Sequence, residues 1–313
     1  MEAYTGGIST RKVDALVEAL GGDSGISKSE VSRICQGLDE QVKAFLGRPL
    51  EHARYPYVYL DATYLHGRLG RNLQVVSRVV VVAIGINAAL GYREVLGIAV
   101  GDSEAEGFWR QFLGSLKERG LTGTRLVISD AHLGLTAAIK RMFQGNRWQR
   151  CRVHFLRNLL SHVPKVGQDM VAAAMKAVFV IQAPDQVRAH WQRITEMLRK
   201  QFPNAVPVME AARDDVPAFL HFPQEHWRKN WSTNPLERLN KEIKRRTNVV
   251  GIFPNDPAIV RLVGSQLLEQ QEEWQLERRR FFSEATMAKI PEPEEPLVLP
   301  DADPDQLTPA GIR

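Results

Sequence analysis

Three acidic residues could together form a metal-dependent catalytic site. Asp61 lies in the middle of a predicted strand, Asp130 closes another, and Glu237 lies in the first turn of a predicted helix. If the two strands are neighbours, both aspartates reach one sheet edge, where Glu237 can join them. Three converging carboxylates repel one another unless cations neutralise them, and hard oxygen ligands favour Mg²⁺ or Mn²⁺. Two such ions, about 4 Å apart, promote phosphodiester displacement by activating the attacking oxygen and stabilising the leaving one.

Each acid also has an ordinary structural explanation. An Asp at a strand end is usually a turn or cap residue, which would account for Asp130. A Glu in the first turn of a helix complements the helix dipole, which would account for Glu237. Asp61 is harder to explain in this way, because an acid within a strand is disfavoured without a partner. Other acids within residues 102–106 lie at a predicted helix start, where capping is sufficient.

The elements that must position these acids follow from the residue pattern between Tyr55 and Cys151. The expected order is β-β-β-α-β-α-β, with strands at 57–64, 73–87, 92–100, 126–129 and 148–151 and helices at 103–119 and 133–143. This order predicts an α/β fold with a ribonuclease H-like core. In such a core the sheet is mixed, and its first and fourth strands are adjacent and parallel. Asp61 and Asp130 are therefore expected side by side.

The chain flanking this core is expected to be helical. Residues 1–52 predict two helices around a glycine-rich turn, a helix-turn-helix in which Lys28 and Arg33 face outward as DNA contacts. An ordinary helical hairpin fits that pattern equally well. The core is expected to run over 53–154, a helical insertion over 155–230, the Glu-bearing and C-terminal helices over 231–290, and a disordered acidic tail over 291–313.

Trp227 and Trp231 lie beside Arg228 and Lys229, just before the Glu-bearing helix. Core packing is the ordinary explanation of the two indoles. The alternative is stacking on an unpaired DNA base near a cleaved end, which would make them DNA-binding residues.

Charge is distributed unevenly. Residues 1–290 carry 40 Lys and Arg against 30 Asp and Glu, and no acid occurs between Ala131 and Gln168. A second basic cluster consists of Arg238, Lys241, Lys244, Arg245 and Arg246. Such stretches indicate a polyanionic partner, although a single basic run can also be a solvated helix face. With two cysteines, no signal peptide and no long apolar run, we expect a soluble intracellular protein without a membrane span.

Cys151 and His154 form a C-x-x-H pair. A zinc site would need a second pair of ligands, and the remaining cysteine of the chain is Cys35, so a mononuclear zinc site is disfavoured. The ordinary explanation is a buried thiol and a hydrogen-bonded imidazole that brace the junction between the last strand and the insertion.

Several motifs resemble the bacterial transposases of the Mutator family over roughly residues 5–285. They include Tyr59-Leu-Asp-Ala62, Ser129-Asp-Ala-His-Leu-Gly134, Cys151-Arg-Val-His154 and Thr233-Asn-Pro-Leu-Glu-Arg-Leu-Asn240. The N-terminal motifs are Gly7-Ile-Ser-Thr-Arg-Lys-Val13 and Gly25-Ile-Ser-Lys-Ser-Glu-Val-Ser-Arg33, and Arg245-Arg-Thr247 follows the Glu-bearing helix start.

The resemblance implies a DDE triad of Asp61, Asp130 and Glu237 with two Mg²⁺ or Mn²⁺ ions. It further implies a double-stranded DNA partner (the inverted repeats of an insertion sequence and the target), a homo-oligomer on DNA, and a cytoplasmic, nucleoid-associated location in bacteria. Cys151 and His154 are implied to support the site or contact the DNA strand. Family members usually have a further N-terminal DNA-binding stretch, so a truncated copy is one expectation.

Two other functions fit the same residues. One is a catalytically silent, DNA-binding remnant of a transposase. The other is a ribonuclease or a structure-specific nuclease, such as a Holliday-junction nuclease, on the same fold. The predicted helix-turn-helix and the large helical insertion argue against a minimal nuclease, which needs neither.

Overall fold

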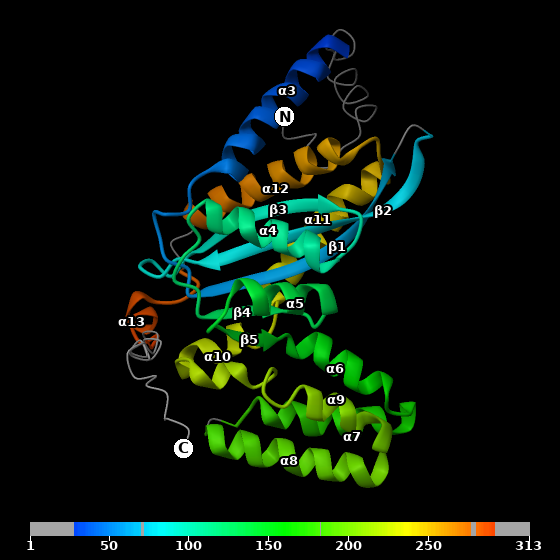
Figure 1. The fold of residues 1–313 in the computed structure, drawn as a ribbon, viewed down its shortest axis with the longest axis vertical. Coiled ribbons are helices and arrows are strands. Elements are labelled where there is room, and N and C mark those ends of the chain that lie inside the picture. The colour runs from blue at the N-terminus through cyan, green and yellow to red at the C-terminus, as the bar shows by residue number, and fades with distance from the viewer. Residues whose placement is uncertain (1–27, 70–71, 182, 277–279, 292–313) are drawn as a thin grey trace, which may run out of the picture.

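The computed structural model describes residues 28–69, 72–181, 183–276 and 280–291, and Figure 1 shows their arrangement. The first helix and the turn of the expected helix-turn-helix lie outside these residues, as does nearly all of the acidic tail. A central sheet with helices on both faces forms one body, and a block of helices forms a second body beyond the sheet edge (Figure 1).

The sheet is mixed, and its first and fourth strands are adjacent and parallel, as predicted. The path is β3-β2-β1-β4-β5, and β6 pairs with the far end of β1. β1, β2 and β3 are antiparallel, whereas β4 and β5 run parallel to β1. The strands are β1 (Tyr57–Leu69), β2 (Gln74–Ile86), β3 (Arg93–Gly101), β4 (Leu126–Ser129), β5 (Arg147–Arg150) and β6 (Ile252–Phe253).

The side chains of β1 alternate between two hydrophobic cores, one on each face of the sheet. Val58 and Leu60 pack with α4 (Glu106–Glu118) and α5 (Leu133–Met142). Tyr57 and Tyr59 point to the opposite face, where α11 (Asn234–Val250) and α12 (Asp256–Leu276) cover them. Both faces of the sheet are covered by helices. The part of β2 from Val79 to Ile86 is therefore a continuous apolar run that is wholly buried.

The second helix expected within residues 1–52 corresponds to α3 (Lys28–Gly47). Its C-terminal part packs on α12, where a Cβ added at Gly264 would lie 2.4 Å from Val42 Cγ1. An ion pair of 2.6 Å between Arg261 and Asp39 fixes the same crossing. The N-terminal part of α3 extends beyond the sheet body (Figure 1).

The second body, here called the helical block, covers residues 152–231 and contains no strand among its described residues. Its core includes Phe155, Val171, Trp191 and Phe219. Pro164 precedes α7 and Pro184 opens α8, positions at which a proline is compatible with a helix. The helices are α6 (Arg152–Ser161), α7 (Lys165–Val178), α8 (Pro184–Gln201), α9 (Val206–Ala211) and α10 (Trp227–Asn230).

The C-terminal helix expected within residues 231–290 is α12 (Asp256–Leu276). After residues 277–279, which lie outside the described part, the chain continues to the short helix α13 (Glu284–Met287). The backbone N–H groups of Phe281 and Phe282 donate to Gly91 O, which ties this segment to the β2–β3 turn. In the described part of the chain, no helix combines the length and hydrophobicity that a bilayer crossing requires.

Candidate active site

Asp61 and Asp130 come together because of the register between β1 and β4. Tyr57 is level with Leu126 and Tyr59 with Ile128, and the same register carried forward sets Asp61 level with Asp130. Parallel strands place equivalent positions at one edge of the sheet. The negative charge of Asp130 contributes to raising the pKa of Asp61, as is expected for two carboxyl groups on adjacent strands.

Asp61 is a buried carboxyl group, 8% exposed, with one defined side-chain partner. Asn240 Nδ2 donates a 2.8 Å hydrogen bond to Asp61 Oδ2. Burial is the main reason that the pKa of Asp61 is raised to about 6, and repulsion from Asp130 adds to it. The charge of His154 and the hydrogen bonds from Ala62 and Asn240 act in the opposite direction. A buried acid next to another acid is an environment suited to a cation.

The side chain of Asp130 also stabilises the turn that follows β4, as the sequence indicated. Its Oδ1 accepts a 3.2 Å hydrogen bond from the backbone N–H of His132, at the turn that leads into α5. The side chain is half-buried, between the end of β4 and the start of the helix. The turn role and a metal-binding role are compatible, because a carboxylate has a second oxygen.

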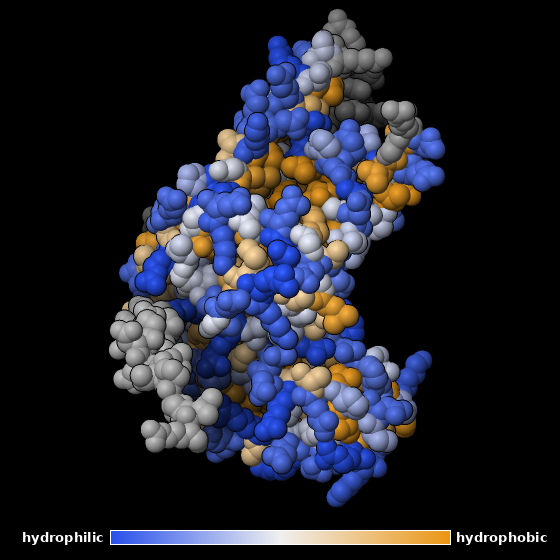
Figure 2. All heavy atoms as spheres, in the orientation of Figure 1, coloured by the Kyte–Doolittle hydropathy of each residue, from blue (hydrophilic) through white to orange (hydrophobic). Residues whose placement is uncertain are grey.

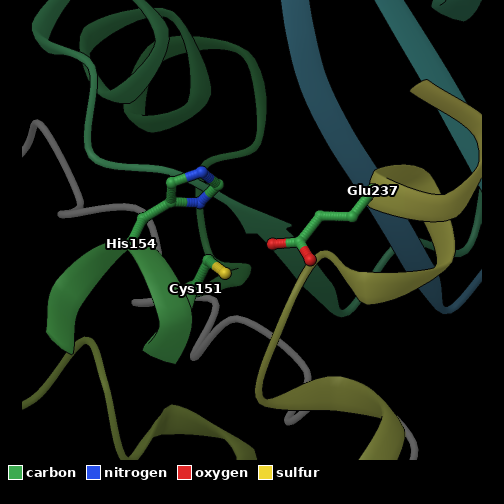
Figure 3. A group of neighbouring side chains, drawn as sticks. All are labelled: Cys151, His154 and Glu237. Carbon is green, nitrogen blue, oxygen red and sulfur yellow. The ribbon is translucent and has the colours of Figure 1, made fainter. Parts of the chain in front are cut away.

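Glu237, in the first turn of α11, does not complete a tight group with the two aspartates. Figure 3 shows its carboxylate directed toward His154 and Cys151. Within the described residues, the set of three potential ligands whose donor atoms all lie within 4.8 Å of one another is Cys151, His154 and Glu237. His154 in turn feels the charges of Asp61 and Asp130. Glu237 thus lies beside the His154 imidazole, whose pKa the charges of Asp61 and Asp130 help to raise.

Cys151 links the end of β5 to the segment before α11. Its Sγ lies 3.4 Å from both the backbone N and the Oγ1 of Thr233, which donate hydrogen bonds to it. Its backbone N donates to Ser129 O in β4 at 2.7 Å. Burial opposes ionisation of the thiol, but hydrogen bonds with His154 and Thr233 outweigh it and lower the pKa. This geometry supports the bracing role that the sequence suggested.

The surroundings of His154 favour its protonated form. The hydrogen bond with Cys151 is the main reason that its pKa is raised to about 9; burial opposes the rise, and the charges of Cys151, Asp61 and Asp130 reinforce it. Its Nδ1 is buried with no hydrogen-bond partner among the residues the structure describes. A protonated imidazole at this place can balance the carboxylates or bind a phosphate.

Sequence reasoning missed Asn240 as a site residue. It lies three positions after Glu237, so both project from one face of α11. Its Oδ1 is buried and has no hydrogen-bond partner in the described part of the chain. The available signal was an amide in the Thr233–Asn240 motif at helical spacing from the Glu.

The basic cluster of α11 divides into paired and exposed members. Arg245 and Arg246 both form salt bridges with Glu242, and Arg246 also pairs with Glu269. Lys241 and Lys244 are exposed and form no salt bridge with any described residue. The ordinary explanation thus accounts for the arginines and leaves the two lysines available.

Trp227 and Trp231 are buried in the core of the helical block, at 8% and 9% exposure. Both rings pack edge-on against Phe219, with centroids 5.5 and 5.8 Å away, and Trp227 Nε1 donates to Phe222 O at 2.8 Å. The geometry favours the packing interpretation over base stacking. Arg33, by contrast, is exposed on α3, and the side chain of Lys28 lies outside the described part.

The buried Asp61 carboxyl leads to a prediction about stability in the absence of metal. Its folded-state pKa of about 6 lies above the usual value of about 4, so stability should fall by up to about 3 kcal/mol as pH rises from about 4 to about 6. Asp61→Asn should therefore be more stable than the native chain at pH 7, with an advantage that shrinks as pH falls through this window. Urea unfolding with a chelator across this pH range measures it, and a pH-independent difference would contradict it.

The chain combines a mixed sheet with an acid on each of two adjacent parallel strands, Asp61 within β1 and Asp130 directly after β4. The family described as "Transposase, Mutator family" matches residues 1–277. The chain belongs to that family. It is 43% identical over 280 residues to the transposase for insertion sequence element IS1081 of Mycobacterium tuberculosis, covering 89% of this chain and 66% of the relative.

A second relative is the transposase for insertion sequence element IS256 in transposon Tn4001 of Staphylococcus aureus, 36% identical over 285 residues, with 90% of this chain and 72% of the relative covered. The chain thus spans just under two thirds of the IS1081 relative. The Drosophila P element transposase strand transfer complex aligns with a TM-score of 0.33 and 10% identity over 91% of this chain and 83% of that chain, which is too low to carry an inference.

Proposed function

We propose that this chain is a DDE-type DNA transposase that cleaves and joins DNA strands at the inverted-repeat ends of an insertion sequence. The observation that carries the proposal is the buried Asp61, level with Asp130, with Glu237 and Asn240 on the α11 face that meets them. Membership of the Mutator family supports it. The strand order β3-β2-β1-β4-β5, in which β1–β3 are antiparallel, supports a ribonuclease H-like core.

The residues fit a divalent-metal site. Asp61 is a buried carboxyl whose pKa is raised by burial and by Asp130, so a cation between them would relieve both effects. Asp61, Asp130 and Glu237 offer hard oxygen ligands, which suit two Mg²⁺ or Mn²⁺ ions. When bound, the ions would activate an attacking oxygen and stabilise a leaving one.

The remaining residues of the site orient these ligands and contact the DNA. Asn240 donates a hydrogen bond to Oδ2 of Asp61 and so fixes the orientation of this carboxylate. Thr233 holds the Cys151 thiol, and the thiol in turn keeps His154 protonated. The His154 imidazolium can then hold a non-bridging oxygen of the reacting phosphate. Water would be the first nucleophile and the freed 3′-hydroxyl the second.

DNA binding is assigned to basic residues outside the catalytic centre. Arg33 and Lys28 on α3 are proposed to read the terminal repeats, and Lys241 and Lys244 on α11 to hold the DNA backbone. Because two DNA ends must meet for strand transfer, a homo-oligomer on the DNA is part of this proposal.

One assay separates the proposed function from its alternatives. The purified protein is incubated with Mg²⁺ and a pre-cut oligonucleotide duplex that ends in the element's terminal repeat. Strand joining is the expected result. Hydrolysis without joining would instead indicate a structure-specific nuclease, and binding without reaction would indicate a catalytically silent remnant.

The basic face of α11 provides a separate prediction. Replacing Lys241, Lys244 and Arg245 by Ala should weaken binding to repeat and random DNA alike, and the salt slope should flatten by about 0.9 for each phosphate that is no longer neutralised. Binding curves from low to moderate salt measure this slope. Arg193→Ala with Lys200→Ala, exposed on α8, is the matched control.

If these residues serve only the helix, the same triple variant would be slightly less stable, and the salt slope would stay unchanged. Since Arg245 already pairs with Glu242, most of the decrease in DNA affinity should come from the two lysines.

A further inference from the structure

A cavity of about 380 Å³ lies in the helical block between α6 and α7. Its floor is apolar and includes Leu156, Leu160, Met175 and Phe179. Figure 2 shows hydrophobic side chains at the surface among hydrophilic ones in the region of these helices. The volume is within the range of pockets that hold small organic groups.

The charged residues at this cavity are of one sign. Arg152, Arg157 and Lys176 line it, and no acid does. Within the described residues, none of these three forms a salt bridge with a carboxylate. Arg228 adds a further positive charge close to Arg152. Cations around an apolar floor are complementary to a group with a flat apolar part and a phosphate.

Arg152 is held in a defined position. Its guanidinium lies 4.1 Å from the ring centroid of Trp231 and 5.1 Å from that of Phe179. Its backbone N–H also donates to Trp231 O at 2.9 Å. A guanidinium fixed in this way loses little further freedom when it binds an anion or stacks on a base.

The cavity begins at the candidate active site. Arg152 and Val153, which line it, stand between Cys151 and His154 in the first turn of α6. His154 feels the charges of Asp61 and Asp130. The first turn of α6 thus carries both His154, at the candidate active site, and two of the residues that line the cavity.

We infer that this cavity, here called the α6–α7 pocket, binds one unpaired nucleotide of the DNA strand beside the reacting phosphodiester. The base enters the apolar floor against Phe179 and Arg152, and Arg157 and Lys176 contact the adjacent phosphates. This inference rests on the proposed function, because it needs DNA at the catalytic site. The unpaired base would then contact this pocket at the surface beside Trp231, and not the buried indoles of Trp227 and Trp231.

The test compares two DNA duplexes, one that is fully paired and one that carries a single unpaired nucleotide at its end. That nucleotide is 2-aminopurine, whose fluorescence reports whether the base is stacked, and binding is measured in Ca²⁺. The native chain should bind the unpaired duplex roughly tenfold or more tightly than the fully paired one. Leu156→Trp, which fills the pocket, should abolish this preference and keep the affinity for paired DNA. Val166→Trp, at a 95% exposed position on α7, is the matched control.

A second variant tests the pocket in case Leu156→Trp does not fold. Arg157→Gln with Lys176→Gln changes only exposed side chains and should also reduce the preference, whereas Lys200→Gln on α8 should not. Equal affinity of the native chain for both duplexes would overturn the inference, as would a preference that survives pocket filling. Competition by free dAMP as strong as that of the unpaired duplex would also overturn it, in favour of a mononucleotide site.

Failure of this inference is distinguishable from failure of the proposed function. Binding in Ca²⁺ reports the pocket without any catalysis, whereas strand joining in Mg²⁺ reports the function. If the chain joins strands but shows no preference for the unpaired nucleotide, the proposed function stands and the role of the α6–α7 pocket is contradicted.

Discussion

Asp61→Asn is expected to reduce DNA strand cleavage and joining on the order of a thousandfold or more, while DNA affinity stays the same or rises. The substitution keeps the hydrogen-bonding shape of the side chain but removes the buried charge that would hold the metal ions. A decrease of this size is typical when a preorganised group that stabilises the transition state is removed. Removing a negative charge near the DNA phosphates cannot weaken electrostatic binding.

The measurement is strand joining under single-turnover conditions, with DNA binding recorded in parallel. Asp185→Asn, an acid exposed at the start of α8, is the matched control and should behave like the native chain. Strand joining retained in Asp61→Asn would remove this residue from the catalytic centre.

Trp231→Ala is expected to lower the free energy of unfolding by about 3–5 kcal/mol, as for other buried aromatic side chains. Trp231 is 9% exposed and contacts Phe179, Phe219 and Arg152, so truncation leaves a cavity in the helical block. Urea unfolding followed by circular dichroism measures the change. Val180→Ala, at a 78% exposed position of the same block, should cost less than about 0.5 kcal/mol.

The alternative role of Trp231 gives a different result. If the indole stacked on a DNA base, Trp231→Ala would leave the unfolding free energy almost unchanged and weaken DNA binding by about 1–3 kcal/mol. That outcome would restore the base-stacking interpretation and contradict the observed burial of the indole.

The sheet could be predicted from the sequence because its signals are local. The branched and aromatic run around Asp61 predicted β1, and the short apolar run before Asp130 predicted β4. The expected order β-β-β-α-β-α-β then predicted that the first and fourth strands are neighbours in the sheet. The pairing of Tyr59 with Ile128 confirmed this adjacency.

Element ends were less predictable because packing rather than local propensity decides them. α3 continues to Gly47, since its second half is supported by α12. The first turn of α6 begins at Arg152, three residues before the expected start at Phe155, since Cys151 and Arg152 are tied to β4 and to Trp231 by backbone hydrogen bonds.

The details of the site could not be predicted from the sequence, because they depend on how α6 and α11 are placed. Nothing local to Asn240 shows that it donates to Asp61. The approach of Glu237 to Cys151 and His154 likewise joins segments that are far apart in the chain. A tryptophan is equally suited to core packing and to stacking on a DNA base. Only the burial of Trp227 and Trp231 in the structure distinguishes these two interpretations.

Anomalous scattering from crystals soaked in Mn²⁺ would locate the metal ions relative to Asp61, Asp130 and Glu237. Anomalous peaks are expected in contact with the carboxylates of Asp61 and Asp130, with Glu237 turned toward them, and these peaks should disappear in Asp61→Asn. A peak held by Cys151 and His154 without the aspartates, or no peak at the aspartates at saturating Mn²⁺, would contradict the assignment of these acids as the catalytic metal site.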